Sequence, residues 1–132
     1  MDNLFKKSID RNAINSEELE VLRKIANHLE IVYSQNDISV KNGSIIKMNL
    51  KSSGVETLPD SIGLLGNLNT LHLNGNRLKK IPDAIRRIKT LSHLDLHNNI
   101  LTTLPNWIIE LDRLKILNLA KNSFKKYPAV IH

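Results

Sequence analysis

A sequence motif repeats every 23 residues through the last two thirds of the chain, and this repeat limits the possible folds more than any other feature. The segment LHLNGNRLKKIP at 71–82 returns as LDLHNNILTTLP at 94–105 and as LNLAKNSFKKYP at 117–128, and a looser copy, MNLKSSGVETLP, lies at 48–59. All 4 prolines of the chain occupy the same position of this motif. A fixed period of this length predicts a solenoid, in which each unit is one small supersecondary structure stacked on its neighbours.

Each unit has a strand half and a return half. The units start with an apolar residue, at Ile45, Leu68, Leu91 and Leu114. An apolar-x-apolar opening such as Leu71-His72-Leu73 is the alternation of a strand that buries one face. The later LPxxIxxL half, as at 104–111, shifts toward helical spacing, and its proline is tolerated in the first turn of a short helix. Because no unit can bury its apolar face alone, we expect the units to stack.

An asparagine recurs at the turn after each strand, at Asn76, Asn99 and Asn122. Backbone groups turn inward at this place and need hydrogen-bond partners, which a buried amide supplies as both donor and acceptor. We therefore expect the stacked asparagines to bond the backbone of neighbouring units. Ser53 takes this position in the first unit, and its shorter side chain indicates a weaker step at the edge of the array.

The pattern LxxLxLxxNxLxxLPxxIxxLxx, seen at 68–90 and 91–113, resembles the leucine-rich repeat family. Its 23-residue LPxxI form is similar to the intracellular type found in Ras-associated scaffolds and in small prokaryotic and archaeal repeat proteins. The resemblance covers residues 45–132 and implies an α/β fold, a right-handed leucine-rich-repeat solenoid with a parallel sheet on its concave side. For function, it implies a scaffold that binds a protein partner and has no catalysis of its own.

Residues 1–44 do not follow the repeat and are expected to form an N-terminal cap, which leaves 45–132 as the repeat domain. The spacing of Asn15-Ser16-Glu17-Glu18 predicts a helix that begins with a capping box. The apolar series that follows predicts an amphipathic helix whose buried stripe contains Leu19, Leu22, Ile25, Ala26 and Leu29.

Two further elements are expected around this helix. Leu4, Phe5 and Ile9 indicate a shorter helix before it. Asn42-Gly43, between alternating apolar residues, predicts a β-hairpin whose added strand runs antiparallel to the first repeat strand. Together with the longer helix, this hairpin would cover the open end of the core.

The residues between the strand leucines are expected to point outward on the concave side of the sheet. Stacking restricts the leucines and leaves these intervening positions free to carry function, so we interpret them as the partner-binding surface. They are Lys47, Asn49, Lys51, Thr70, His72, Asn74, His93, Asp95, His97, Ile116 and Asn118.

Three of the 5 histidines fall on this surface, beside one carboxylate. His93, Asp95 and His97 alternate along one strand, and His72 should lie directly across from Asp95. Imidazole and carboxylate groups at this spacing are candidate ligands for Zn²⁺ or Cu²⁺. An exposed, flat sheet lacks the surrounding groups that orient metal ligands, so the favoured interpretation is a polar binding face without a metal or other cofactor.

The same residues allow two other interpretations. A histidine base oriented by Asp95 would suit an enzyme, but Thr70 is the one hydroxyl nucleophile on this face and no deep pocket is expected. We therefore predict no catalytic residues. A pH-sensitive interface fits the cluster better than catalysis does, because clustered histidines titrate near neutral pH.

The net charge of +6, from 19 Lys+Arg against 13 Asp+Glu, raises the question of an acidic partner. Basic residues gather in one return segment, at Lys79, Lys80, Arg86, Arg87 and Lys89. The alternative function is therefore electrostatic binding of RNA or an anionic membrane through this edge. Thr102 and Thr103 interrupt the lysine column and no aromatic platform accompanies it, so neither nucleic acid nor membrane is the expected partner.

Two apolar features suggest contacts with other chains. Trp107, the one tryptophan, is a candidate interaction hot spot, with partial burial against the return segment as the alternative. The last strand, 114–119, would leave an unpaired edge, where we expect an end-to-end homodimer, with a capping partner protein or a monomer as alternatives. The residues of this candidate dimer edge are Ile116, Leu117, Leu119, Phe124, Tyr127 and Ile131.

The absence of cysteine excludes disulfides and thiolate metal sites. No apolar run is long enough to span a membrane, and the N-terminal segment MDNLFKKSID lacks the apolar stretch of a signal peptide. The expected location is therefore the cytoplasm.

Overall fold

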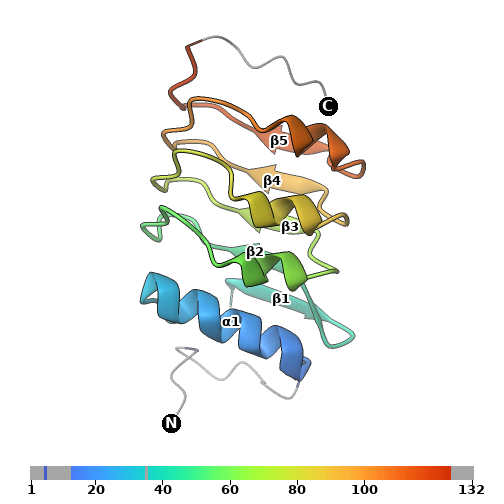
Figure 1. Ribbon diagram of the computed structural model, residues 1–132. Helices are drawn as coiled ribbons and strands as arrows, with labels where there is room; N and C mark the ends of the chain where they lie inside the picture. Colours follow the sequence, from blue (N-terminus) through green and yellow to red (C-terminus); the bar gives the residue numbers. More distant parts are fainter. Residues whose placement is uncertain (1–4, 6–12, 35, 126–132) are drawn as a thin grey trace.

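The structure is a computed structural model that describes Phe5, residues 13–34 and residues 36–125. Its elements are, in order, α1 (Ser16–Leu29), β1 (Ile38–Lys41), β2 (Ser44–Asn49), the 3-10 helix η2 (Asp60–Leu64), β3 (Thr70–His72), η3 (Asp83–Arg87), β4 (His93–Asp95), η4 (Asn106–Glu110) and β5 (Ile116–Asn118). Figure 1 shows these elements stacked in layers from α1 to β5, with the 3-10 helices on one side and the strands on the other. The predicted α/β solenoid is confirmed.

One sheet of 5 strands, in the order β1-β2-β3-β4-β5, forms one side of the described chain. β1 pairs antiparallel with β2, and every later pair is parallel. In each parallel pair a residue faces the same repeat position of the next unit, so Leu71 lies opposite Leu94 and Leu94 lies opposite Leu117. This register matches the repeat alignment made from the sequence.

The leucine columns form the core between the sheet and the 3-10 helices. Leu71 and Leu94, at the middle of β3 and β4, are fully buried, and Ile85 of η3 is fully buried from the opposite side. Each 3-10 helix begins after a proline, and in η3 the backbone N–H of Ile85 donates to the carbonyl of Pro82 at 3.1 Å. Proline fixes φ and donates no hydrogen bond, so it ends the extended segment and starts the tight turn. The expected short helical return is therefore a 3-10 turn.

The asparagine column acts as expected on the backbone. The side-chain oxygen of Asn76 accepts hydrogen bonds from the backbone N–H groups of Ser53 and Val55. Its amide nitrogen donates to the carbonyls of Leu50 and Leu73, so one side chain links two units. The same linkage continues in the next units, at Asn99 and Asn122.

The N-terminal hairpin is confirmed. β1 and β2 are joined at Asn42 and Gly43, whose φ angles are 52° and 82°. Two successive positive φ values are those of the tight turn that Asn-Gly favours. The shorter helix expected through Leu4 and Ile9 lies outside the described residues, while Phe5 forms an isolated parallel bridge with Tyr33.

Helix α1 begins at the predicted cap but its acidic residue has another role. The side chain of Asn15 accepts from the backbone N–H of Glu18 at 2.8 Å, which is the first half of a capping box. The second half is replaced, because the backbone N–H of Asn15 donates to the carbonyl of Gly43. The carboxylate of Glu18 is buried and accepts from the backbone N–H of Ile45 at 2.7 Å. Glu18 thus joins the helix to the first repeat strand.

Of the two alternatives for Trp107, burial against the return segments is confirmed and the exposed hot spot is wrong. Trp107 is 8% exposed, and its indole N–H faces the carboxylate of Asp83 at 3.4 Å. Ala84, at the same repeat position in η3, is buried as well. The 3-10 turn points this position toward the preceding unit, so the large indole is covered by stacking.

The cap and the repeats share one hydrophobic cluster, which runs from Ile14 to Leu114. β2 begins at Ser44, next to the expected division between 1–44 and 45–132, and that division stays a prediction. Among the helices of the described residues, none has the length and apolar character needed to cross a membrane.

Candidate functional site

The solvent side of the sheet carries all the residues predicted to bind a partner, and each of them is partly or fully exposed. We call this surface the strand face. The strand pairing aligns it in two rows across the repeats: Lys47, Thr70, His93 and Ile116, then Asn49, His72, Asp95 and Asn118. Lys51, Asn74 and His97 follow the ends of the strands. The stacked repeats therefore turn positions that are far apart in the sequence into one continuous surface.

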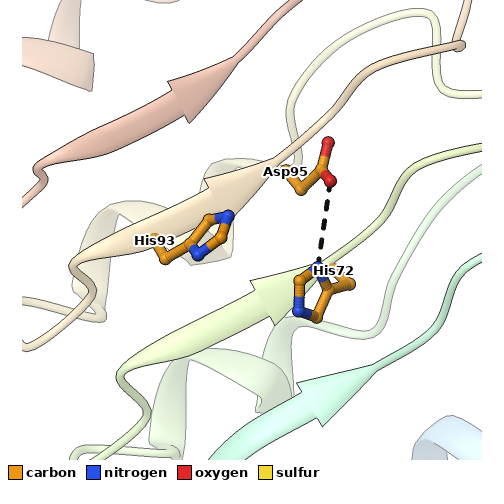
Figure 2. Close-up of side chains that lie close together, drawn as sticks. All are labelled: His72, His93 and Asp95. Atoms are coloured by element: carbon orange, nitrogen blue, oxygen red, sulfur yellow. Dashed lines mark ion pairs between the residues drawn. The ribbon is translucent and has the colours of Figure 1, made fainter.

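A compact polar cluster lies at the centre of the strand face. His72 is directly opposite Asp95, as expected from the sequence, and His93 lies two residues before Asp95 on β4. The ligand atoms of these three side chains lie within 4.8 Å of one another. Figure 2 shows the three side chains close together on the neighbouring strands β3 and β4, with the carboxylate of Asp95 facing the ring of His72. The rings of His72 and His93 meet edge to face at a centroid distance of 5.2 Å.

Asp95 is held by His97, two residues further along the chain. Its Oδ1 accepts from the backbone N–H of His97 at 3.1 Å and contacts Nδ1 of His97 at 2.6 Å. Its Oδ2 lies 3.9 Å from Nδ1 of His72. His97 therefore orients the carboxylate from one side, and the other oxygen faces His72.

The protonation of His72 follows from its surroundings. Burial lowers the pKa of His72, and the nearby His93 and Lys47 lower it further. The carboxylate of Asp95 raises this pKa, but its effect is smaller. The imidazole of His72 is thus neutral at pH 7, and its contact with Asp95 is not an ion pair at that pH.

Thr70, the nucleophile considered from the sequence, is hydrogen-bonded outside the histidine–aspartate cluster. The hydroxyl of Thr70 donates to the side chain of Asn69 at 3.1 Å. In the described part of the strand face, histidine and carboxylate groups are therefore not joined to a hydroxyl nucleophile.

A second polar surface, which the sequence reasoning missed, is a shallow hollow beside the start of the strands. Its lining includes Lys41, Asn67, Asn69, Thr90 and Arg113. The signal was present as two polar columns beside the first leucine column, with Asn67, Thr90 and Arg113 in one of them. The hydroxyl of Thr90 donates to the carbonyl of Leu68 at 2.6 Å, so part of this column joins adjacent units.

Residues 66–124 match the sequence profile described as leucine rich repeat. This segment belongs to the leucine-rich repeat family. The match indicates a family of binding scaffolds rather than a catalytic family, while the LPxxI subtype stays a prediction. The comparison with curated proteins found no match.

The fold is similar to that of several solved structures. The leucine-rich-repeat ectodomain of the receptor kinase SOBIR1 from Arabidopsis thaliana has a TM-score of 0.69 and 27% identity, covering 83% of this chain and 68% of that chain. A structure of the BIR3–SERK2 complex from Arabidopsis thaliana has a TM-score of 0.53 and 25% identity, covering 80% of this chain and 81% of that chain. A leucine-rich repeat protein of Leptospira interrogans has a TM-score of 0.51 and 27% identity, covering 64% of this chain and 25% of that chain.

Proposed function

We propose that this protein is a non-catalytic binding module that presents the strand face to a protein partner. The observation that carries the proposal is the alignment of exposed side chains in rows above buried leucines such as Leu71 and Leu94. Because the leucines are locked in the core, the rows form a rigid surface that loses little conformational freedom on binding. The similarity to a structure of a protein complex, BIR3–SERK2, supports the same role.

The chemistry of the strand face varies along the solenoid. Lys47 and Lys51 lie at the N-terminal end, the histidine–aspartate cluster lies at the centre, and Ile116, which is 52% exposed, lies at the other end. Such a mixture suits a protein interface, in which an apolar contact is surrounded by polar groups. A partner with an acidic group opposite the lysines and an apolar group opposite Ile116 would fit this face.

The test compares two charge-changed variants as baits in pull-downs from native lysate, with captured proteins identified by mass spectrometry. Asp95→Lys combined with His72→Glu changes the centre of the strand face and should remove partners that the wild type retains. Glu56→Lys combined with Lys80→Glu changes two exposed residues of the return segments and should retain them. Loss of the same partners from the second variant alone would place binding on the other side of the solenoid.

Electrostatic binding of RNA or an anionic membrane is not supported by the comparisons. One charge of the basic edge is also neutralised, because Arg86 forms a bidentate ion pair with Glu110 at 3.0 and 3.1 Å. The guanidinium of Arg87 keeps its charge but is held by a hydrogen bond to the backbone carbonyl of Asp60. Polyanion binding would weaken steeply as salt concentration rises, and binding of a protein partner to the strand face should weaken far less.

A second candidate role is an end-to-end homodimer through β5. Within the described residues, β5 pairs with a strand only on its β4 side, and Ile116 on β5 is exposed. Leu117, Leu119 and Phe124 of the candidate dimer edge pack partly buried against the core, while Tyr127 and Ile131 lie outside the described residues. Light scattering should give the mass of two chains, and Ile116→Lys should reduce it to one; a wild-type mass of one chain contradicts the dimer.

The cytoplasmic location expected from the sequence stays a prediction.

A further inference from the structure

We propose that His72, His93 and Asp95 bind one divalent transition-metal ion of the zinc class on the strand face. The convergence of two imidazoles and one carboxylate, with ligand atoms within 4.8 Å of one another, carries this inference. The proposal goes beyond the protein-binding role and does not depend on it.

The backbone that presents the three ligands is rigid. β3 and β4 are paired in register, with His72 directly opposite Asp95, and the leucines between the ligand positions are fully buried. The ligand atoms of a tetrahedral zinc site lie about 3.4 Å apart, as follows from metal–ligand distances near 2.1 Å. His72 Nδ1 and Asp95 Oδ2 are 3.9 Å apart, so small side-chain rotations bring them to this spacing.

The structure also supplies the orienting group whose absence argued against a metal in the sequence analysis. The backbone N–H and Nδ1 of His97 both contact Oδ1 of Asp95, which leaves Oδ2 directed at His72. Groups that hold a ligand in this way typically change metal affinity by about 10–100-fold when they are removed. His97 is therefore assigned as a positioning residue, and not as the fourth ligand of the candidate set drawn from the sequence.

The donor set selects the class of ion. Two nitrogen ligands and one carboxylate oxygen suit Zn²⁺, Cu²⁺ and related borderline ions, whereas Mg²⁺ and Ca²⁺ prefer oxygen ligands throughout. Three protein ligands also leave a coordination position open toward solvent. The nearby cations Lys47 and Lys51, whose charges act on His72, oppose a bound cation, so we expect weaker binding than in closed structural zinc sites.

The test is calorimetric titration of the full chain with Zn²⁺ at pH 7, with Mg²⁺ as the control ion. We expect one Zn²⁺ per chain and no heat from Mg²⁺. His72→Ala, His93→Ala and Asp95→Asn should each remove the site, and His97→Gln should weaken binding by about 10-fold or more while keeping one ion per chain. His28→Ala and His132→Ala are the matched controls and should bind as the wild type does.

Two further measurements keep the outcome decisive. Circular dichroism should show that each strand-face variant is folded, because the substituted side chains of that face are partly exposed. Bound Co²⁺ should give the visible absorption of a four- or five-coordinate ion in the wild type but not in His93→Ala. Zn²⁺ should raise the Tm of the wild type and of the two control variants, but not that of His72→Ala, His93→Ala or Asp95→Asn. Absence of a Zn²⁺ heat and a Co²⁺ spectrum in the wild type overturns the proposal. Equal binding by the triple variant of His72, His93 and Asp95 overturns it as well.

Discussion

The two ends of the sheet carry the same repeat positions in different surroundings. At the N-terminal end, Leu50 of the first unit is 1% exposed, because β1 pairs with β2 and α1 covers the core beside it. At the other end of the described chain, Leu119 occupies the same repeat position but is only partly buried. A repeat position is therefore not buried by its own unit. Its burial, and the free energy that burial supplies, depends on the neighbour that stacks against it.

The largest expected effect is on the free energy of unfolding, when the same leucine position is changed to alanine at each end of the sheet. Leu50→Ala should lower the free energy of unfolding by about 2–5 kcal/mol, because it leaves a cavity in a closed core layer. Leu119→Ala should cost at least about 1 kcal/mol less, since solvent already reaches that side chain. Urea unfolding followed by circular dichroism measures both. Equal losses would mean that the two ends are covered to the same degree.

The next effect concerns how α1 is attached to the first repeat. Glu18→Ala removes the acceptor of the Ile45 N–H and should cost about 1–3 kcal/mol, because that N–H stays buried without a partner. Glu18→Gln keeps an acceptor oxygen in place and serves as the matched control, with a smaller loss. Similar losses in the two variants would assign the effect to the charge of Glu18 and not to its hydrogen bond.

A smaller effect is expected at the turn of the hairpin that covers the N-terminal edge. Gly43 has φ of +82°, where an added Cβ meets no other atom, so Gly43→Ala tests backbone strain alone. We expect a loss of about 1–2 kcal/mol in unfolding free energy. Gly66 has equally open space but lacks a positive φ, so Gly66→Ala should be neutral or slightly stabilising. A neutral Gly43→Ala would show that the turn tolerates another conformation.

The smallest effect is expected at the centre of the sheet, away from both ends. The pKa of His72 is lowered in the folded protein, chiefly by burial, so the unfolded chain takes up a proton at a higher pH than the folded protein does. Protonation of His72 therefore favours the unfolded chain. The free energy of unfolding is not reduced by this effect above the ordinary histidine pKa of about 6.5, and it falls as the pH drops below that value. Proton NMR titration should place the pKa of His72 below 6.5, and Asp95→Asn should lower it further; a pKa above 6.5 contradicts the assigned balance.

The repeat made most of the fold predictable. Because every unit must bury the same leucines, the period set the strand register, which the pairing of Leu71 with Leu94 confirms. It also predicted the role of Asn76, and the local Asn42-Gly43 pair predicted the turn of the hairpin. The placement of His72 opposite Asp95 followed from the same register. These features are local or periodic, so a single sequence contains them.

Other features depended on contacts between elements that no period describes. The sequence left the exposure of Trp107 undecided and suggested a closed capping box at Glu18. In the structure, η4 places the indole against Asp83, and the carboxylate of Glu18 reaches the backbone of Ile45. The sequence also grouped His97 with the candidate metal ligands, and only the side-chain geometry turned it toward Asp95. The stacking of the units, and the set of residues that share the strand face, thus follow from the repeat pattern. Which side chains contact one another depends on the folded structure, because each rotamer is selected by packing against neighbours distant in the sequence.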